Sequence, residues 1–173
     1  MGSNAIRILG IDPGLRATGY GLIEQRGSSL AFILCGAIKT GAERPLAERL
    51  AAIYRALTEL IERERPDEAA IEETFVNRDP QSALKLGQAR GIALVVPAKA
   101  GVPVAEYAPN LVKKSIVGAG HGEKVQVRMM VGVLLPAADP RSDDAADALA
   151  IAVTHAHHRQ SVIVTTTLKA AAP

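Results

Sequence analysis

The stretch Ile-Leu-Gly-Ile-Asp-Pro-Gly at residues 8–14 ends a short apolar segment with a carboxylate and a turn. The apolar run over residues 6–12 predicts a buried strand, and Pro13 and Gly14 predict the turn that follows it. An acid directly before such a turn lies at the carboxyl end of its strand, where α/β sheets expose their sites. Asp12 is therefore a candidate functional carboxylate, with a turn-capping role as the ordinary alternative.

The rest of the chain alternates short apolar runs with segments of helical periodicity. Further strands are predicted at residues 18–24, 29–40, 68–74 and 103–107. Helices are predicted at residues 45–65, 81–96, 109–117, 123–135 and 142 to about 158, with Asp79 and Ser142 as caps. This order predicts an α/β fold in which helices flank a mixed sheet, close to the ribonuclease H-like arrangement. We expect one domain over residues 1–158 and a flexible tail over residues 159–173.

Composition excludes several classes of protein. The chain has 173 residues, of which 48% are hydrophobic and 22% charged, and no apolar run is long enough to span a bilayer. Arg7 interrupts the N-terminal apolar stretch, so we do not expect a secretory signal. Cys35 is the only cysteine, which excludes an internal disulfide and a cysteine-based zinc site. A single thiol suits a reducing compartment, and we expect a cytoplasmic protein.

The net charge of +2 conceals an uneven distribution. Residues 76–130 hold eight basic and three acidic residues, whereas the rest of the chain has a net charge of −3. A basic middle segment is what a protein that binds a polyanion needs. Ordinary scatter of surface charge would give the same count, so both interpretations stay open.

Two further acidic clusters resemble Asp12 in their setting. Glu72 and Glu73 follow the apolar Ala-Ala-Ile at residues 69–71, so at least one of them faces the crowded side of a strand. The sequence pattern does not choose between them, because the strand register is unknown. Asp144 and Asp147 are three residues apart, which puts both on one face of a helix. Acids are also common in the first turn of a helix, where the helix dipole favours them.

These acids together predict a metal site made of oxygen ligands. Four carboxylates come from distant parts of a chain that has no cysteine pair to add to them. Hard oxygen ligands favour Mg²⁺ or Mn²⁺ over zinc. Two such ions about 4 Å apart can activate water and stabilise the leaving oxygen in phosphodiester hydrolysis.

Several longer motifs make the chain resemble the RuvC family of bacterial Holliday-junction resolvases. They are Ile-Leu-Gly-Ile-Asp-Pro-Gly at 8–14 with Thr-Gly-Tyr-Gly at 18–21, Ala-Ile-Glu at 70–72, Ser-Ala-Leu-Lys-Leu-Gly-Gln-Ala-Arg-Gly at 82–91, and Asp-Ala-Ala-Asp-Ala-Leu-Ala at 144–150. The run at 82–91 is the most specific of them, and the similarity covers residues 6–158. It implies a ribonuclease H-like fold and a homodimer that nicks two opposed strands of a four-way DNA junction.

The resemblance also implies roles for individual residues. It selects Asp12, Glu72, Asp144 and Asp147 as ligands of Mg²⁺ or Mn²⁺, two ions per site, and leaves Glu73 as a neighbour. It assigns Lys113 and Lys124 to the region of the scissile phosphates. Phe75 matches the aromatic that stacks on an opened base. Apart from the resemblance, Arg78 and Lys85 in the basic middle segment are candidate contacts to the DNA backbone. The branch-migration proteins RuvA and RuvB are candidate partners.

Two features depart from the family's pattern. His121 and Gly122 precede Lys124, so contacts with DNA there can differ, and the segment after His158 matches nothing. His121 and His155 are candidate proton carriers, with solvent exposure and helix packing as the alternatives.

Other functions remain as alternatives. A RuvC-like relative that processes RNA shares the strand with Asp-x-Gly, and a junction-binding protein without catalysis would share the fold. An actin-like ATPase also begins with Asp-x-Gly but needs two duplicated domains, for which 173 residues are too few.

The segment at residues 81–96 is the predicted dimer interface. It carries more apolar residues than one sheet-facing stripe needs, and Gly87 and Gly91 lie four residues apart on one face. Glycine is unfavourable in a helix unless another backbone approaches closely. The alternative is that these glycines pack on the chain's own sheet.

Overall fold

The computed structural model describes residues 5–73, 80–118 and 123–170, with side chains described as far as residue 159. These residues form a five-stranded mixed sheet with the order β3-β2-β1-β4-β5. Strand β2 is antiparallel to both β1 and β3, whereas β4 is parallel to β1 and to β5. The strands are β1 (Ile6–Asp12), β2 (Ala17–Arg26), β3 (Ser29–Lys39), β4 (Glu68–Glu72) and β5 (Val104–Tyr107).

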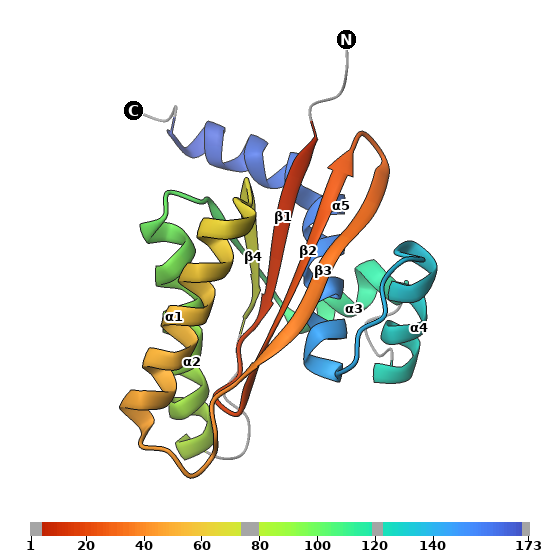
Figure 1. Cartoon of the computed structure of the whole chain (residues 1–173). Coiled ribbons are helices and arrows are strands. Elements are labelled where there is room, and N and C mark those ends of the chain that lie inside the picture. Colours follow the sequence, from red (N-terminus) through yellow and green to blue (C-terminus); the bar gives the residue numbers. More distant parts are fainter. Residues whose placement is uncertain (1–4, 74–79, 119–122, 171–173) are drawn as a thin grey trace.

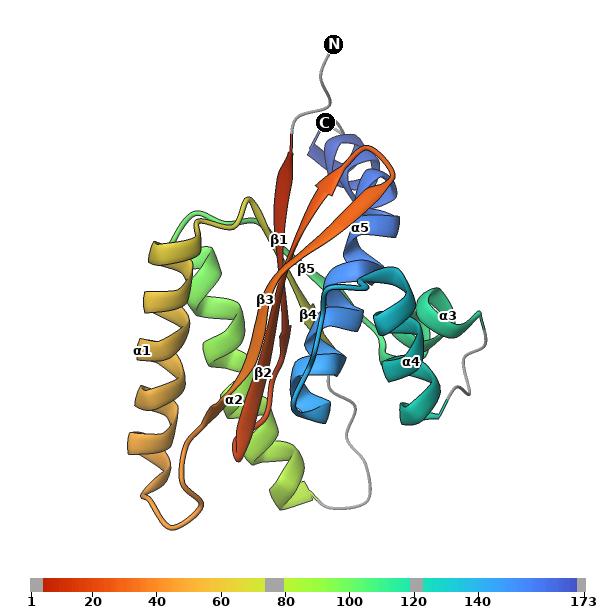
Figure 2. The same cartoon turned by 45° about the vertical axis from the view of Figure 1, so that its right-hand side comes forward.

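Helices cover both faces of this sheet (Figures 1 and 2). One face carries α1 (Leu46–Glu64) and α2 (Pro80–Lys99), and the other carries α3 (Pro109–Val117), α4 (Lys124–Leu134) and α5 (Asp143–Ala170). The arrangement confirms the predicted α/β fold, a mixed sheet flanked by helices. No helix in the described part of the chain is long and apolar enough to cross a membrane.

The ends of two elements differ from the prediction. Helix α5 continues to Ala170, so its predicted end near residue 158 is wrong; no proline interrupts the chain before Pro173. Strand β4 ends at Glu72, and the predicted cap Asp79 lies outside the described residues. The predicted cap of α5 is confirmed, because the Ala145 N–H donates to Ser142 Oγ at 3.2 Å. The division into a domain at 1–158 and a tail at 159–173 stays a prediction.

The alternation of side chains along β1 decides which face receives Asp12. Ile8 belongs to the core beneath α5, whereas Leu9 and Ile11 belong to the core beneath α1 and α2. Successive side chains of a strand point to opposite faces, so Gly10 and Asp12 share the α5 face with Ile8. The strand therefore directs its terminal carboxylate towards α5.

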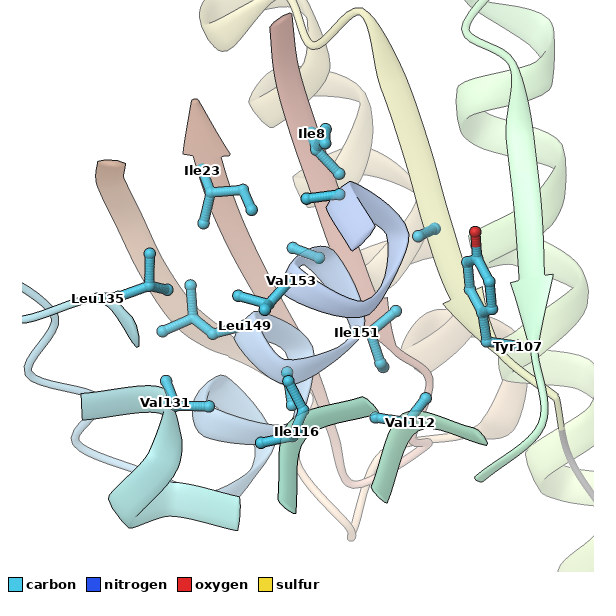
Figure 3. Packing of buried hydrophobic residues seen from close by; sticks show 14 of the residues in the cluster. Ile8, Ile23, Tyr107, Val112, Ile116, Val131, Leu135, Leu149, Ile151 and Val153 are labelled. Carbon is cyan, nitrogen blue, oxygen red and sulfur yellow. The ribbon is translucent and has the colours of Figure 1, made fainter. Parts of the chain in front are cut away.

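Two apolar cores hold the layers together. Helix α1 contributes Ile53, Leu57, Leu60 and Ile61, a buried stripe at helical spacing. On the opposite face, α5 supplies Leu149, Ile151 and Val153, which pack with side chains from α3, α4, β1 and β2 (Figure 3). Burying each of these side chains contributes roughly 1.5–3 kcal/mol to stability.

Helix α5 lies unusually close to β1 and β2. A Cβ atom placed on Gly10 would lie 2.0 Å from the Ala148 carbonyl oxygen, and one on Gly19 would lie 2.0 Å from the Asp144 carbonyl oxygen. The helix side of this contact is rich in alanine, including the buried Ala145, Ala148 and Ala152. Small residues on both sides allow the backbone of α5 to touch the sheet.

This contact predicts that Gly10→Ala destabilises the fold. The new methyl group would overlap backbone atoms of α5, so we expect a loss of about 3 kcal/mol in the free energy of unfolding. Gly132→Ala on α4 is the matched control, because a Cβ there meets nothing within 4 Å. The control should gain up to about 1 kcal/mol from helix propensity. Urea unfolding of both variants measures the difference, and equal stabilities would contradict the close contact.

Candidate active site

The candidate carboxylates gather where β1 and β4 end beside the first turns of α5. The parallel pairing of Ile11 with Ile71 sets the residues that follow them, Asp12 and Glu72, side by side. Asp144 and Asp147 lie on the first turns of α5, which the close packing on β1 and β2 holds against this edge. The edge is the lower end of the sheet in Figure 1.

Asp12, Glu72 and Asp147 line one hollow of about 300 Å³ together with Lys113 and Lys124. Its remaining walls come from α3, α4 and α5 and are mainly apolar: Pro109, Val112, Val127 and Ala150. Asp144 lines a neighbouring hollow, but its charge still acts on Asp12. Five of the six residues predicted to act in catalysis thus share one hollow, and the sixth borders it.

The carboxylates in this hollow destabilise one another's charged forms. Burial raises the pKa of Asp12 to about 8, with added repulsion from Glu72, Asp147 and Asp144. Burial and the charge of Asp147 raise the pKa of Glu72 to about 7. Burial likewise raises the pKa of Asp147. A buried cluster of this kind binds either protons or cations.

Two lysines partly offset this repulsion. The Lys124 ammonium nitrogen lies 3.6 Å from Asp147 Oδ2, and its charge also lowers the pKa of Asp12. Lys113 and Lys124 both act against the rise in the pKa of Glu72. The hollow therefore combines three half-buried carboxylates with two cationic side chains.

Glu73 lies on the other side of the sheet from this cluster. Ala70 belongs to the core beneath α5 and Ile71 to the core beneath α1 and α2, so alternation puts Glu72 on the α5 face and Glu73 on the opposite one. The Glu73 N–H donates to the Tyr107 carbonyl oxygen at 2.8 Å, which extends the pairing of β4 with β5. Strand register thus separates the two glutamates that the sequence pattern left equivalent.

The candidate ligands have the chemistry that a divalent cation prefers, but their side chains do not converge on one point. All the acidic ligands are oxygens, as Mg²⁺ and Mn²⁺ prefer, and their raised pKa values indicate a deficit of positive charge. Yet no three His, Cys, Asp or Glu side chains converge as ready ligands within the described ranges.

The other predicted residues fall elsewhere. Lys85 lies on α2 and lines the same neighbouring hollow as Asp144. Phe75, Arg78 and His121 lie outside the described residues. His155 is buried away from the hollow, where Tyr107 Oη and Glu68 Oε2 each lie 2.7 Å from one of its ring nitrogens.

The sequence analysis missed the polar network around Glu68. Its carboxylate forms a hydrogen bond with the His155 ring and an ion pair with the Arg159 guanidinium, and these two contacts lock the middle of α5 to the start of β4. Hydrogen bonds from Arg159 and His155 lower the pKa of Glu68, the reverse of the shift at Glu72 on the same face. The sequence did contain a signal for this network: Glu68, Ala70 and Glu72 are alternate residues of one strand, so Glu68 is expected on the same face of the sheet as Glu72.

Comparison with known proteins agrees with this geometry. The family model described as "Crossover junction endodeoxyribonuclease RuvC" matches residues 8–155. The chain belongs to the RuvC family. The RuvC protein of Xanthobacter autotrophicus is 64% identical over 159 residues, covering 92% of this chain and 94% of that protein. The RuvC protein of Azorhizobium caulinodans is 61% identical with the same coverage.

Solved structures show the RuvC fold in full. Thermus thermophilus RuvC in complex with a Holliday junction substrate is 37% identical, with a TM-score of 0.84 over 91% of this chain and 96% of that one. The yeast mitochondrial Holliday junction resolvase is 15% identical, with a TM-score of 0.66 over 92% of this chain and 81% of that one, so the likeness is one of fold. The ribonuclease H-like fold is therefore shared by the family and this chain.

The raised pKa of Asp12 predicts a pH-dependent stability without divalent cations. The pKa of Asp12 is about 8 in the folded protein and 3.8 ordinarily, so the folded state binds the Asp12 proton more tightly than the unfolded state does. The stability that this proton provides is fully present below pH 4 and is lost as the pH rises to 8. Asparagine does not ionise, so the Asp12→Asn variant does not lose this stability as the pH rises. In EDTA, the variant should exceed the parent by about 2 kcal/mol at pH 8, a melting-temperature gain of about 4–8 °C.

Glu59→Gln is the control for this measurement, because Glu59 is an exposed carboxylate on α1. Its stability relative to the parent should not change between pH 4 and pH 8. An Asp12→Asn difference that is the same at both pH values would contradict the proton-binding behaviour of the cluster.

Proposed function

We propose that this chain is a structure-selective, metal-dependent endonuclease that resolves four-way DNA junctions by symmetrical nicking. The observation that carries the proposal is the hollow in which Asp12, Glu72 and Asp147 meet Lys113 and Lys124 in a RuvC-family chain. Several relatives bear the name crossover junction endodeoxyribonuclease, which states the same activity for them. The composition of the hollow suits cleavage of a phosphodiester, because its acids need cations and its lysines attract phosphate.

Asp12, Glu72, Asp144 and Asp147 are the residues that would hold Mg²⁺ or Mn²⁺, with two ions per site. The ions supply activation of water and stabilisation of the leaving 3′-oxygen when they are bound. The carboxylates orient them at the sheet edge, and the apolar walls from α3 and α5 limit the access of bulk water. Burial strengthens each of these electrostatic interactions relative to water.

Lys113 and Lys124 are proposed to act on the scissile phosphate. A cation held beside the reacting phosphate stabilises the negative charge that develops in the transition state. The Lys124 ammonium, which lies 3.6 Å from Asp147 Oδ2, would contact phosphate oxygens when the substrate is bound. For Phe75 we propose stacking on an opened base, and for Arg78 contact with the DNA backbone.

The decisive experiment supplies a labelled synthetic four-way junction, with and without Mg²⁺ or Mn²⁺. We expect paired nicks in the junction strands, no cleavage of linear duplex, and no cleavage without the metal. Asp12→Asn, Glu72→Gln, Asp144→Asn and Asp147→Asn should each slow cleavage by about 10³-fold or more while junction binding survives. Binding survives because affinity for DNA comes from basic groups on phosphates.

Glu73→Gln is the matched control, since it removes the adjacent carboxylate, which lies on the opposite face of the sheet, and should cleave at the parental rate. Loss of cleavage in Glu73→Gln but not in Glu72→Gln would contradict the proposed ligand set. Cleavage of an RNA duplex in preference to the junction would favour the RNA-processing alternative. Junction binding without cleavage, both in Mg²⁺ and in Mn²⁺, would favour the alternative of a junction-binding protein without catalysis.

We further propose that the active form is a homodimer built on one face of α2. Leu84 and Val95 are exposed by 70% and 53%, and Gly87 and Gly91 lie between them at helical spacing. A Cβ on either glycine would meet nothing within 4 Å among the residues that the structure describes, so the alternative that these glycines pack on the chain's own sheet is wrong. A two-fold axis beside α2 would present two active sites to opposed strands. We also propose the branch-migration proteins RuvA and RuvB as partners, and the cytoplasm as the compartment.

Gly87→Leu tests the dimer without disturbing the protomer. A Cβ at this position meets nothing within 4 Å among the residues that the structure describes, so the variant should fold, sediment as a monomer and lose coordinated nicking of both strands. Gly132→Leu on α4 is the control, because that glycine is equally open. Analytical ultracentrifugation at micromolar concentration measures the association. A parent protein that sediments as a monomer and still makes paired nicks would contradict the proposal.

A further inference from the structure

A second hollow of about 760 Å³ borders the carboxylate cluster. Asp144 forms part of its wall, and the other contributing elements are the β1–β2 turn with the first residue of β2, the β3–α1 connection, and the starts of α1 and α2. None of its lining residues belongs to α3 or α4, which form the wall of the first hollow. The start of α2 and the α3–α4 pair lie on opposite sides of the first turn of α5 (Figures 1 and 2).

This second hollow is cationic. Arg16, Arg49 and Lys85 line it, against the single carboxylate of Asp144. Arg16 and Lys85 are exposed, and neither has an ion-pair partner within the part of the chain that the structure describes. A concave surface lined by charges of one sign concentrates the opposite charge.

The turn that carries Arg16 is held in place before any ligand arrives. The Leu15 carbonyl oxygen accepts hydrogen bonds from Thr40 Oγ1 at 2.6 Å and from Arg49 Nη2 at 3.0 Å. Arg49 Nε also donates to Thr40 Oγ1 at 3.1 Å, and the Thr40 N–H donates to the Arg16 carbonyl oxygen at 3.3 Å. Arg49 therefore braces the turn, and the side chain of Arg16 stays available to a ligand.

We propose that this hollow is a phosphate-binding subsite for the nucleotides that flank the scissile phosphate, with Arg16 and Lys85 contacting the backbone of the cleaved strand. The inference rests on the proposed function, which puts the scissile phosphate in the first hollow. Phosphates recur at about 3.4 Å of rise along each strand, so a strand that crosses the cluster must carry further phosphates past its edge. Arg16 and Lys85, which lie beyond Asp144, would contact these flanking phosphates. Their contacts would fix which phosphate of the strand lies over the metal ligands.

Salt dependence of junction binding gives the first test. Each lost phosphate contact reduces the slope of log K against log salt by about 0.7–0.9. Arg16→Gln and Lys85→Gln should each show this reduction and bind the junction more weakly, measured in EDTA so that no cleavage occurs. Arg55→Gln is the control, because Arg55 is an exposed cation on α1 outside both hollows. It should keep the parental slope.

A second test locates the subsite by replacing single charged phosphates of the junction with neutral groups. Single methylphosphonates are placed at each of the three positions on either side of the cleavage point. At one or two positions the neutral group should weaken binding by the parent several-fold and leave binding by the Arg16→Gln, Lys85→Gln double variant unchanged, since the contact is already missing. An equal penalty in parent and double variant at every position overturns the inference, as do parental salt slopes in both single variants.

These outcomes are distinct from failure of the proposed function. If the parent neither binds nor cuts the junction, the endonuclease proposal fails. If the parent binds and cuts the junction with metal, and the two variants keep its salt slope and its methylphosphonate profile, only the flanking subsite is overturned.

Discussion

The contact of α5 with β1 and β2 is the constraint on which the rest of the structure depends. Gly10 and Gly19 leave no side chain between the strands and the helix backbone, and the alanines of α5 complete the fit. Because the helix can approach this closely, its first turns bring Asp144 and Asp147 to the ends of β1 and β4. A larger residue in this contact would move two of the four candidate acids away from the other two. Packing and chemistry therefore depend on the same small residues.

The cluster that this contact creates opposes the stability of the fold. Burial and mutual repulsion raise the pKa values of Asp12, Glu72 and Asp147, so the fully charged cluster is unfavourable at neutral pH. Lys113 and Lys124 offset only part of this repulsion. A site of this kind gains free energy from each added cation, which is the condition for tight binding of metal ions. The fixed Glu68 network farther along α5 holds the helix in place while the cluster remains under repulsion.

The two faces of the sheet carry different proposed functions: one holds the candidate carboxylates, and the other is covered by the helix of the proposed dimer interface. The face covered by α3, α4 and α5 receives Asp12 and Glu72, whereas the opposite face receives Glu73 and the inner side of α2. The outer side of α2 keeps an exposed apolar stripe with two open glycines, a surface suited to a second copy of the chain. The start of the same helix contributes Lys85 to the cationic hollow beside Asp144. Helix α2 thus connects the proposed dimer surface to the proposed path of the DNA strand.

The sequence by itself determined the order of strands and helices, the mixed sheet, and the candidate acids Asp12, Asp144 and Asp147. These features follow from local patterns: apolar periodicity, turn residues and caps act within a few residues of one another. Only the tertiary structure gave the strand register that puts Glu72 and not Glu73 beside the cluster, as the family resemblance implied, because a shift of one residue in register reverses every side chain. It also decided that Arg16, Arg49 and Lys85 share one hollow, since they come from three distant segments that no local pattern relates. The end of α5 escaped prediction for a similar reason: the sequence after residue 158 carries no strong helical signal, whereas Arg159 is anchored by Glu68, 91 residues earlier in the chain.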